Sequence, residues 1–109
     1  MATRKADLGL GGAERRNLRR MAHGLRPAVQ LGGAGLTSAV VDAVDRALED
    51  HELIKLRLAG ERNERRDLAE LAAERTHSTL AGLVGHVAIL YRPARDPGRR
   101  RIDPSRRDT

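Results

Sequence analysis

The sequence has no cysteine, tryptophan or phenylalanine, and Tyr91 is its single aromatic residue. Without cysteine, disulfide scaffolds and thiolate metal sites are excluded. A single aromatic residue argues against the stacking platforms of RRM domains and many OB-folds. No apolar run approaches the roughly 18 residues that a membrane span needs, and the first residues show no signal-peptide pattern. These absences predict a soluble, cytoplasmic protein.

The chain does contain enough aliphatic side chains for one domain with a core, since 39% of its 109 residues are hydrophobic. Its net charge of +6 is concentrated at the two ends. Residues 1–26 hold seven Lys/Arg and two Asp/Glu, residues 27–93 hold eight and ten, and residues 94–109 hold six and three. Charge segregated in this way favours a polyanionic partner. An arginine-rich composition with a solvated surface is the alternative.

Hydrophobic periodicity predicts three helices and four strands. The helices are expected at residues 13–24, 38–50 and 63–76, and the strands at 28–31, 53–58, 79–84 and 87–92. Together they predict the fold class α/β, in the form of an α+β fold with two layers, one of helices and one a sheet. The elements follow the order α-β-α-β-α-β-β. The sheet is expected to be mixed and four-stranded, with the second and third helices on one face. The place of the first helix is left open.

Composition divides the chain into three parts. We expect a flexible N-terminus at residues 1–9, a folded domain at 10–93 and a disordered basic tail at 94–109. The tail is rich in Arg, Asp, Pro and Gly, and Ile102 is the one apolar residue that it offers for burial.

The first expected helix has two unlike faces. Its apolar stripe consists of Leu18, Met21, Ala22 and Leu25. Its opposite side consists of Arg15, Arg16, Arg19 and Arg20. Only Glu14 offsets these four cations, and like charges repel, so we expect them to contact phosphates. A merely solvated charged face is the alternative.

A Gly-x-x-Gly turn, Gly32 to Gly35, joins the strand at 28–31 to the helix at 38–50. Backbone N–H groups beside a helix N-terminus can hold a phosphate, and glycine lets a sugar-phosphate backbone approach closely. Among 11 glycines about one such spacing arises by chance, and two other matches begin at Gly9 and Gly82. Only the middle match lies between a strand and a helix capped by Thr37. It predicts a phosphate-binding loop, with a plain tight turn as the alternative.

No arrangement of residues predicts catalysis. The four histidines lack metal-ligand spacing, the serines lack a G-x-S-x-G setting, and no Lys-Ser or Lys-Thr follows the glycines as in a Walker motif. His77 is expected in a left-handed conformation at a helix end. We therefore expect no enzymatic activity, and no metal, cofactor, membrane or small-molecule substrate as a partner.

Several runs of residues resemble the YhbY family, small bacterial RNA-binding proteins that consist of one CRM domain. These runs are 18–23 (LRRMAH), 26–32 (RPAVQLG), 35–37 (GLT), 47–55 (ALEDHELIK), 84–86 (VGH) and 90–93 (LYRP). The resemblance covers roughly residues 10–93. The run that ends at Lys55 and the Leu-Tyr-Arg-Pro run are far more specific than the glycine loop.

The resemblance implies a fold similar to the C-terminal domain of bacterial translation initiation factor three. It also implies association with precursors of the large ribosomal subunit, through a loop that contacts RNA as in KH domains. On this chain the loop maps to Gly32, Gly33, Ala34 and Gly35. The cations expected to help are Arg15, Arg16, Arg19, Arg20, Arg26, Lys55 and Arg57.

Three positions depart from the family pattern. Gly33 and Ala34 stand where Lys or Ser and Asn are often found, so the loop must bind through main-chain N–H groups. Gly11 stands where a Ser or Thr cap is expected, so the first helix is expected to fray in isolation. Gly82 stands in a strand, where it either weakens pairing or marks a close contact.

These patterns predict a non-enzymatic RNA-binding domain that acts in ribosome assembly on large-subunit precursor rRNA. It would hold RNA by its backbone and favour shape over sequence. Two alternatives are a DNA-binding protein of the nucleoid type and an adaptor that binds acidic proteins through the arginine helix. The sequence does not indicate an oligomeric state.

Overall fold

The computed structural model describes residues 9–106 of the chain. The helices are α1 (Gly12–Ala22), α2 (Ser38–His51) and α3 (Arg62–Arg75), and the strands are β1 (Pro27–Leu31), β2 (Leu53–Leu58), β3 (Thr79–Val84) and β4 (Val87–Tyr91). The predicted order of elements is therefore confirmed. The N-terminus predicted to be flexible lies, apart from Gly9, outside the described residues.

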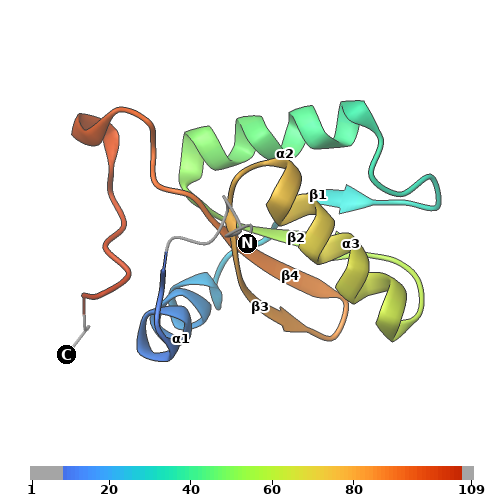
Figure 1. Ribbon diagram of the computed structural model, residues 1–109, viewed down its shortest axis with the longest axis horizontal. Coiled ribbons are helices and arrows are strands. Elements are labelled where there is room, and N and C mark those ends of the chain that lie inside the picture. Colours follow the sequence, from blue (N-terminus) through green and yellow to red (C-terminus); the bar gives the residue numbers. More distant parts are fainter. Residues whose placement is uncertain (1–8, 107–109) are drawn as a thin grey trace, which may run out of the picture.

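The four strands form one mixed sheet in the order β1-β2-β4-β3. β1 is parallel to β2, whereas β4 is antiparallel to both of its neighbours. The carboxyl ends of β1 and β2 therefore lie at the same edge as the β3–β4 turn at Gly85 (Figure 1). The loops that follow β1 and β2, and the first turns of α2 and α3, meet at this one end of the molecule.

α2 and α3 cover one face of the sheet, as predicted (Figure 1). Val44 and Leu48 of α2 pack on the inward side chains of β2, which are Ile54, Leu56 and Leu58. α3 contributes mainly alanines, and Ala69, Ala72 and Ala73 are buried. Leu71 of the same helix is 39% exposed. The close-packed alanine stripe turns it outward.

α1 covers part of the opposite face and adds a partial third layer (Figure 1). Its Leu18 and Ala22 are fully buried against Leu53 and Ile89 of the sheet. Leu25 was predicted to extend this stripe and is instead 41% exposed. The reason is that α1 ends at Ala22, so the helical periodicity no longer applies to Leu25.

Residues 94–106, here called the arm, differ from the disordered tail that their composition predicts. They pass the end of α2, make one short 3-10 turn at Pro97–Arg99 and then run along one end of the domain toward α1 (Figure 1). The arm is held mainly through its backbone, because the carboxylate of Glu52 accepts the N–H groups of Ala94 and Arg101 at 2.7 Å. Composition describes side chains only, so it did not indicate that the backbone of the arm is attached to Glu52.

Two residues other than glycine have a positive φ in the described part of the chain. His77, at the end of α3, has φ +54°, as predicted. Glu52, between α2 and β2, has φ +66°, which the sequence did not indicate. A positive φ is unusual for a residue with a Cβ, and at Glu52 it turns the chain from α2 into β2.

Candidate nucleic-acid interface

The glycine loop, Gly32 to Gly35, lies at the end of the molecule where α2 and α3 begin (Figure 1). The N–H of Gly35 donates to the carbonyl of Gly32 at 3.0 Å and closes a tight turn. Oγ1 of Thr37 accepts the N–H of Val40 at 3.2 Å and caps α2. The predicted context of strand, loop and capped helix is confirmed.

Only some glycines of the loop are required by its backbone conformation. Gly35 has φ +72°, so the turn itself favours glycine there. Gly32 and Gly33 have no such φ, and a Cβ added to either would meet no atom within 4 Å. No acceptor among residues 9–106 takes the N–H groups of Gly33 and Ala34. The outer part of the loop is therefore a small, exposed surface of main-chain donors, which suits a closely approaching phosphate.

A hollow of about 380 Å³ lies between the glycine loop and the first turns of α3. Its lining includes the carboxylates of Glu64 and Asp67 and no Lys or Arg. Glu64 is held in place because its Oε1 accepts the N–H of Glu61 at 3.0 Å. Two negative charges make this hollow unfavourable for a phosphate. An anion on the loop is therefore favoured on its other side, toward the sheet.

The sheet face that α1 partly covers stays open along β1, where Ala28 and Gln30 are exposed. The register pairs Gln30 with the exposed Arg57 of β2, two residues before the loop begins. Arg57 is thus the predicted cation that the structure places beside the strand leading into the loop.

Arg26 and Lys55 lie at the other end of β1. The register pairs Lys55 with Pro27, the first residue of the strand, so about 17 Å of strand separates them from the loop. Nζ of Lys55 donates to the carbonyls of His23 and Leu25 at 3.2 and 3.1 Å. The structure therefore gives Lys55 a role in holding the connection between α1 and β1.

The four arginines of α1 divide into two pairs. Arg15 and Arg19 each donate from Nη1 to a backbone carbonyl of β3, at 2.8 and 2.9 Å. β3 is an edge strand, so these contacts cover carbonyls that would otherwise lie open. Arg16 and Arg20 are exposed and donate to no strand, although Nη2 of Arg20 donates to Oδ1 of Asn17 on the same helix at 3.1 Å.

Gly82 in β3 marks a close contact. A Cβ built on Gly82 would lie 2.5 Å from Cδ of Arg19. The arginine stem therefore occupies the space that a side chain would need. From the sequence, Gly82 was expected either to mark a close contact or to weaken strand pairing. Pairing with β4 is also irregular, between Leu80 and Gly82.

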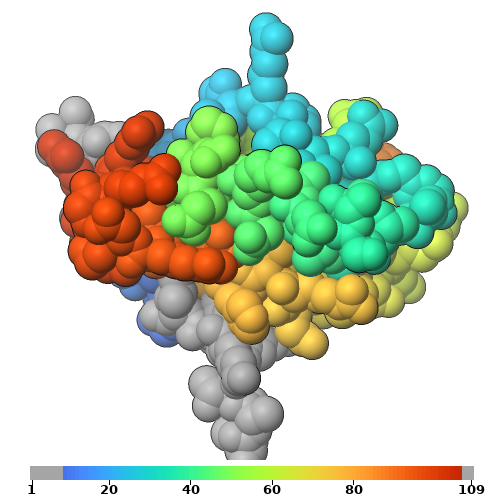
Figure 2. Space-filling model, turned by 90° about the horizontal axis from the view of Figure 1, so that it is seen from above, coloured from blue at the N-terminus to red at the C-terminus, as the bar shows by residue number. Residues whose placement is uncertain are grey.

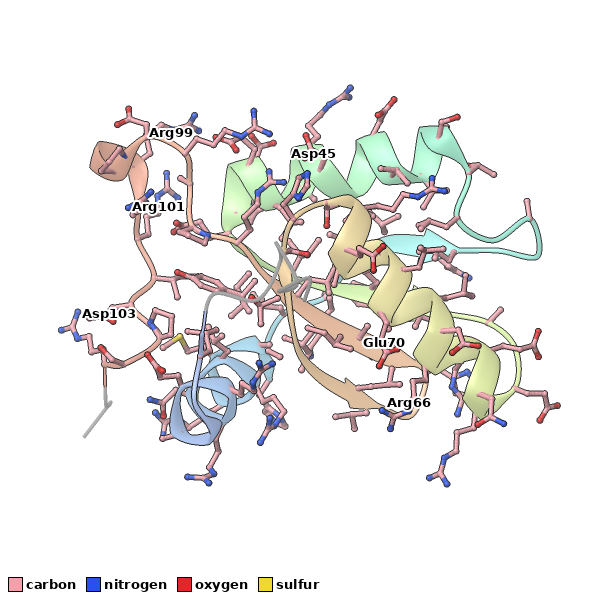
Figure 3. The ribbon with its side chains drawn as sticks, in the orientation of Figure 1. Asp45, Arg66, Glu70, Arg99, Arg101 and Asp103 are labelled. Carbon is pink, nitrogen blue, oxygen red and sulfur yellow. The ribbon has the colours of Figure 1, made fainter. Side chains whose placement is uncertain are left out.

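Arg92, which follows β4, is a polar residue to which the sequence assigned no role. Its Nη1 donates to Oδ1 of Asp45 at 2.7 Å and to the carbonyl of Thr76 at 2.8 Å, and its Nη2 donates to Glu49 at 3.3 Å. Asp45 lies on the outer part of α2 (Figure 3). Arg92 therefore joins α2 and the end of α3 to the sheet. The one feature of the sequence that could have indicated this role of Arg92 is a cation directly after a buried strand.

Within residues 9–106 no helix is both long and apolar enough to cross a membrane. The same residues hold no group of three His, Asp or Glu side chains placed to bind a metal ion.

The sequence pattern of the CRS1 / YhbY (CRM) domain matches residues 10–92. A Haemophilus influenzae RNA-binding protein is 41% identical over 80 residues, which are 72% of this chain and 81% of that protein. A Pseudomonas aeruginosa protein, named as a candidate RNA-binding protein, is 34% identical over 85% of this chain and 90% of its own. A solution structure from Staphylococcus aureus, described as a candidate RNA-binding protein, superposes with a TM-score of 0.74 at 29% identity, over 86% of this chain and 99% of that one.

Proposed function

Because the chain belongs to the CRS1 / YhbY (CRM) domain family, we propose that it is a non-enzymatic RNA-binding protein. We further propose that it acts in ribosome assembly in the cytoplasm, on precursor rRNA of the large subunit. The observation that carries the proposal is the glycine loop. Two of its glycines are not required by the fold, and the N–H groups of Gly33 and Ala34 have no acceptor within residues 9–106.

The surroundings of the loop favour one path for the RNA backbone. The hollow beside α3 is lined by two carboxylates, whereas the open sheet face carries Gln30 and Arg57. A strand of RNA held at the loop would therefore continue over β1 and β2 toward the exposed arginines of α1. Contacts of this kind are made to phosphates and read shape more than sequence.

The substitution Gly33→Asp tests the role of the loop. Its Cβ would meet no atom within 4 Å, so the fold should be kept. Its carboxylate would repel a phosphate, and we expect RNA affinity to fall about tenfold, which corresponds to ~1.4 kcal/mol. The matched control is Ala43→Asp, which adds the same charge to an exposed position of α2. Unchanged affinity of folded Gly33→Asp would show that the loop is only a turn.

A competition titration tests the partner. Labelled structured RNA is bound to the protein and displaced by the same sequence as RNA or as DNA. We expect RNA to compete at lower concentration, because the 2′-hydroxyl and the A-form shape distinguish the two. Equal competition would favour the DNA-binding alternative. Crosslinking in cells, followed by sequencing of the attached RNA, then tests whether the target is large-subunit precursor rRNA.

A further inference from the structure

The arm is held to the domain by one buried carboxylate. Glu52 is 2% exposed, and its two oxygens accept three backbone N–H groups of the arm. The donors are Ala94 at 2.7 Å, Arg101 at 2.7 Å and Ile102 at 3.1 Å. Hydrogen bonds to a charged acceptor are stronger than those between neutral groups. The attachment is made by the backbone of the arm, so it does not use the arginine side chains.

The far part of the arm is attached to α1. Nδ2 of Asn17 donates to the carbonyl of Pro104 at 3.0 Å. Ile102 packs against the apolar cluster that includes Leu18 and Tyr91. The hydroxyl of Tyr91 also donates to the carbonyl of Ile102 at 3.4 Å. The arm and α1 are therefore neighbours in one surface.

The acidic side chains of the arm are engaged in local turns. Asp96 accepts the N–H of Gly98 at 2.9 Å. Asp103 accepts both the N–H and the hydroxyl of Ser105, at 3.0 and 2.7 Å, and these bonds lower the pKa of its carboxyl. Neither forms an ion pair with an arginine within the part of the chain that is described.

Three of the exposed arginines of the arm have no side-chain partner within residues 9–106. Arg99, Arg101 and Arg106 are exposed, and their guanidinium groups make no hydrogen bond or ion pair to residues 9–106. Figure 3 shows Arg99 at the short 3-10 turn and Arg101 farther along the arm. Arg16 and Arg20 add two exposed cations from α1.

The arm lies far from the glycine loop. The two are at opposite ends of the longest axis in both views (Figures 1 and 2), and that axis measures 39 Å. A single phosphate site cannot include both. The cations near the arm therefore need a partner of their own or a partner that extends along the molecule.

We propose that the arm and the outer side of α1 form a second surface for the phosphate backbone of RNA, separate from the glycine loop. Its cations are Arg16, Arg20, Arg99, Arg101 and Arg106. The inference rests on the proposed function, because it assigns the same partner to a second site. Cations on a fixed backbone lose less conformational freedom on binding than cations on a mobile tail. The two surfaces together select an RNA long enough to span the domain.

The chemistry of the arm favours RNA over an acidic protein. A protein interface usually has a central apolar or aromatic anchor. The exposed large hydrophobic residues of the described chain are Leu25, Leu71 and Val84, and none of them lies on the arm. A surface of guanidinium groups without such an anchor suits phosphates.

The first experiment removes positive charge from the arm. The full chain with Arg99, Arg101 and Arg106 changed to Gln is compared with a control in which Arg46, Arg66 and Arg75 are changed to Gln. The control residues are exposed on α2 and α3, so the net charge is the same. The probe is a labelled RNA hairpin longer than the domain. We expect the arm variant to lose about tenfold in affinity at low salt, and its log–log salt slope to fall by about 2. The control should change far less.

The second experiment releases the arm and keeps every arginine. Ile102→Ser combined with Asn17→Ala removes the apolar anchor and the contact with Pro104. Asn17→Ala alone is the control, because Oδ1 of Asn17 also accepts a hydrogen bond from Arg20. Tyr91 reports the release, because burial and nearby Glu52 raise its pKa to about 12, and an exposed tyrosine titrates near 10. We expect tyrosinate to form at lower pH and RNA affinity to fall as in the charge variant. If Tyr91 still titrates near 12, Glu52→Ala is added to free the backbone. Release is then measured by hydrogen exchange of the Arg101 and Ile102 N–H groups, because removing Glu52 itself lowers the pKa of Tyr91.

The outcomes separate this inference from the proposed function. If the unmodified protein does not bind RNA, both are overturned. If Gly33→Asp weakens binding but the arm variant behaves like its control, only the second surface is overturned. If the released arm binds RNA as well as the unmodified protein, the arginines act as a mobile polycation and the fixed surface is overturned. If the arm variant instead loses binding to an acidic peptide and keeps its RNA affinity, the surface belongs to a protein partner and the inference is also overturned.

Discussion

The carboxylate of Glu52 accepts the backbone N–H of Arg101 at 2.7 Å, although 49 residues separate the two along the chain. Glu52 follows α2 directly and has a positive φ, which turns the chain into β2. The same residue thus turns the chain between two core elements and attaches the arm to them. The attachment has consequences for pH dependence, stability and RNA binding that can be measured separately.

Tyr91 is expected to keep its proton in the folded protein to unusually high pH. Burial is the main cause and Glu52 the second, and together they raise its pKa to about 12. In the unfolded chain the pKa is about 10. A raised pKa means that the contribution to stability is present below pH 10 and is lost between pH 10 and 12. Because Tyr91 is the one tyrosine and tryptophan is absent, tyrosinate absorbance measures this directly. Titration of native protein near pH 10 would contradict the burial of Tyr91 under the arm.

The two arginine pairs of α1 should respond differently to substitution by Gln. Changing Arg15 and Arg19 removes two hydrogen bonds to the edge of β3 and should lower the free energy of unfolding by about 1–2 kcal/mol. Changing Arg16 and Arg20 should leave thermal unfolding unchanged and reduce the salt slope of RNA binding by about 1–2. Each double variant is the control for the other, since the charge removed is equal. An unaltered salt slope in the second variant would exclude the outer side of α1 from the interface.

Asp67→Asn is expected to strengthen RNA binding about two- to threefold at low salt, because it removes an exposed negative charge beside the glycine loop. The control is Glu70→Gln, on α3 outside the lining of the hollow (Figure 3). The gain should vanish at high salt, where exposed charges are screened. Weaker binding of Asp67→Asn would place the RNA inside the hollow, against the path proposed over the sheet.

Arg92→Ala should destabilise the fold by about 2–3 kcal/mol, because it leaves the Thr76 carbonyl and two carboxylates without their buried donor. This cost is lower than for a fully buried pair, because the side chain of Asp45 is 44% exposed and can rehydrate. Arg95→Ala is the control. Arg95 approaches the same two carboxylates, but its side chain is 74% exposed, so the expected cost is near zero. The free energy of unfolding is measured with urea. An equal loss in Arg92→Ala and Arg95→Ala would show that burial of Arg92 does not contribute to stability.

The sequence by itself determined the elements and most of the apolar residues that they bury, whereas Leu25 is exposed because α1 ends at Ala22. Alternating Ile54, Leu56 and Leu58 in β2 show which side meets α2 and α3, because side-chain direction in a strand has a period of two. The glycine loop was found because its neighbours, a strand and a helix with Thr37 as cap, are local in the sequence. Hydrophobic periodicity is a local signal, so it remains readable without the fold.

Only the tertiary structure decided which partners the polar residues meet. Glu52 accepts hydrogen bonds from the arm, and Arg92 donates to α2 and to the end of α3. Arg15 and Arg19 donate to the edge strand β3. Each of these contacts joins segments that are distant in the sequence. A buried polar group must find a hydrogen-bonding partner, but its own sequence neighbourhood does not say which backbone folding brings beside it. For this reason the sequence predicted a disordered arm and one four-arginine face, whereas packing fixed the arm and divided the arginines into two pairs.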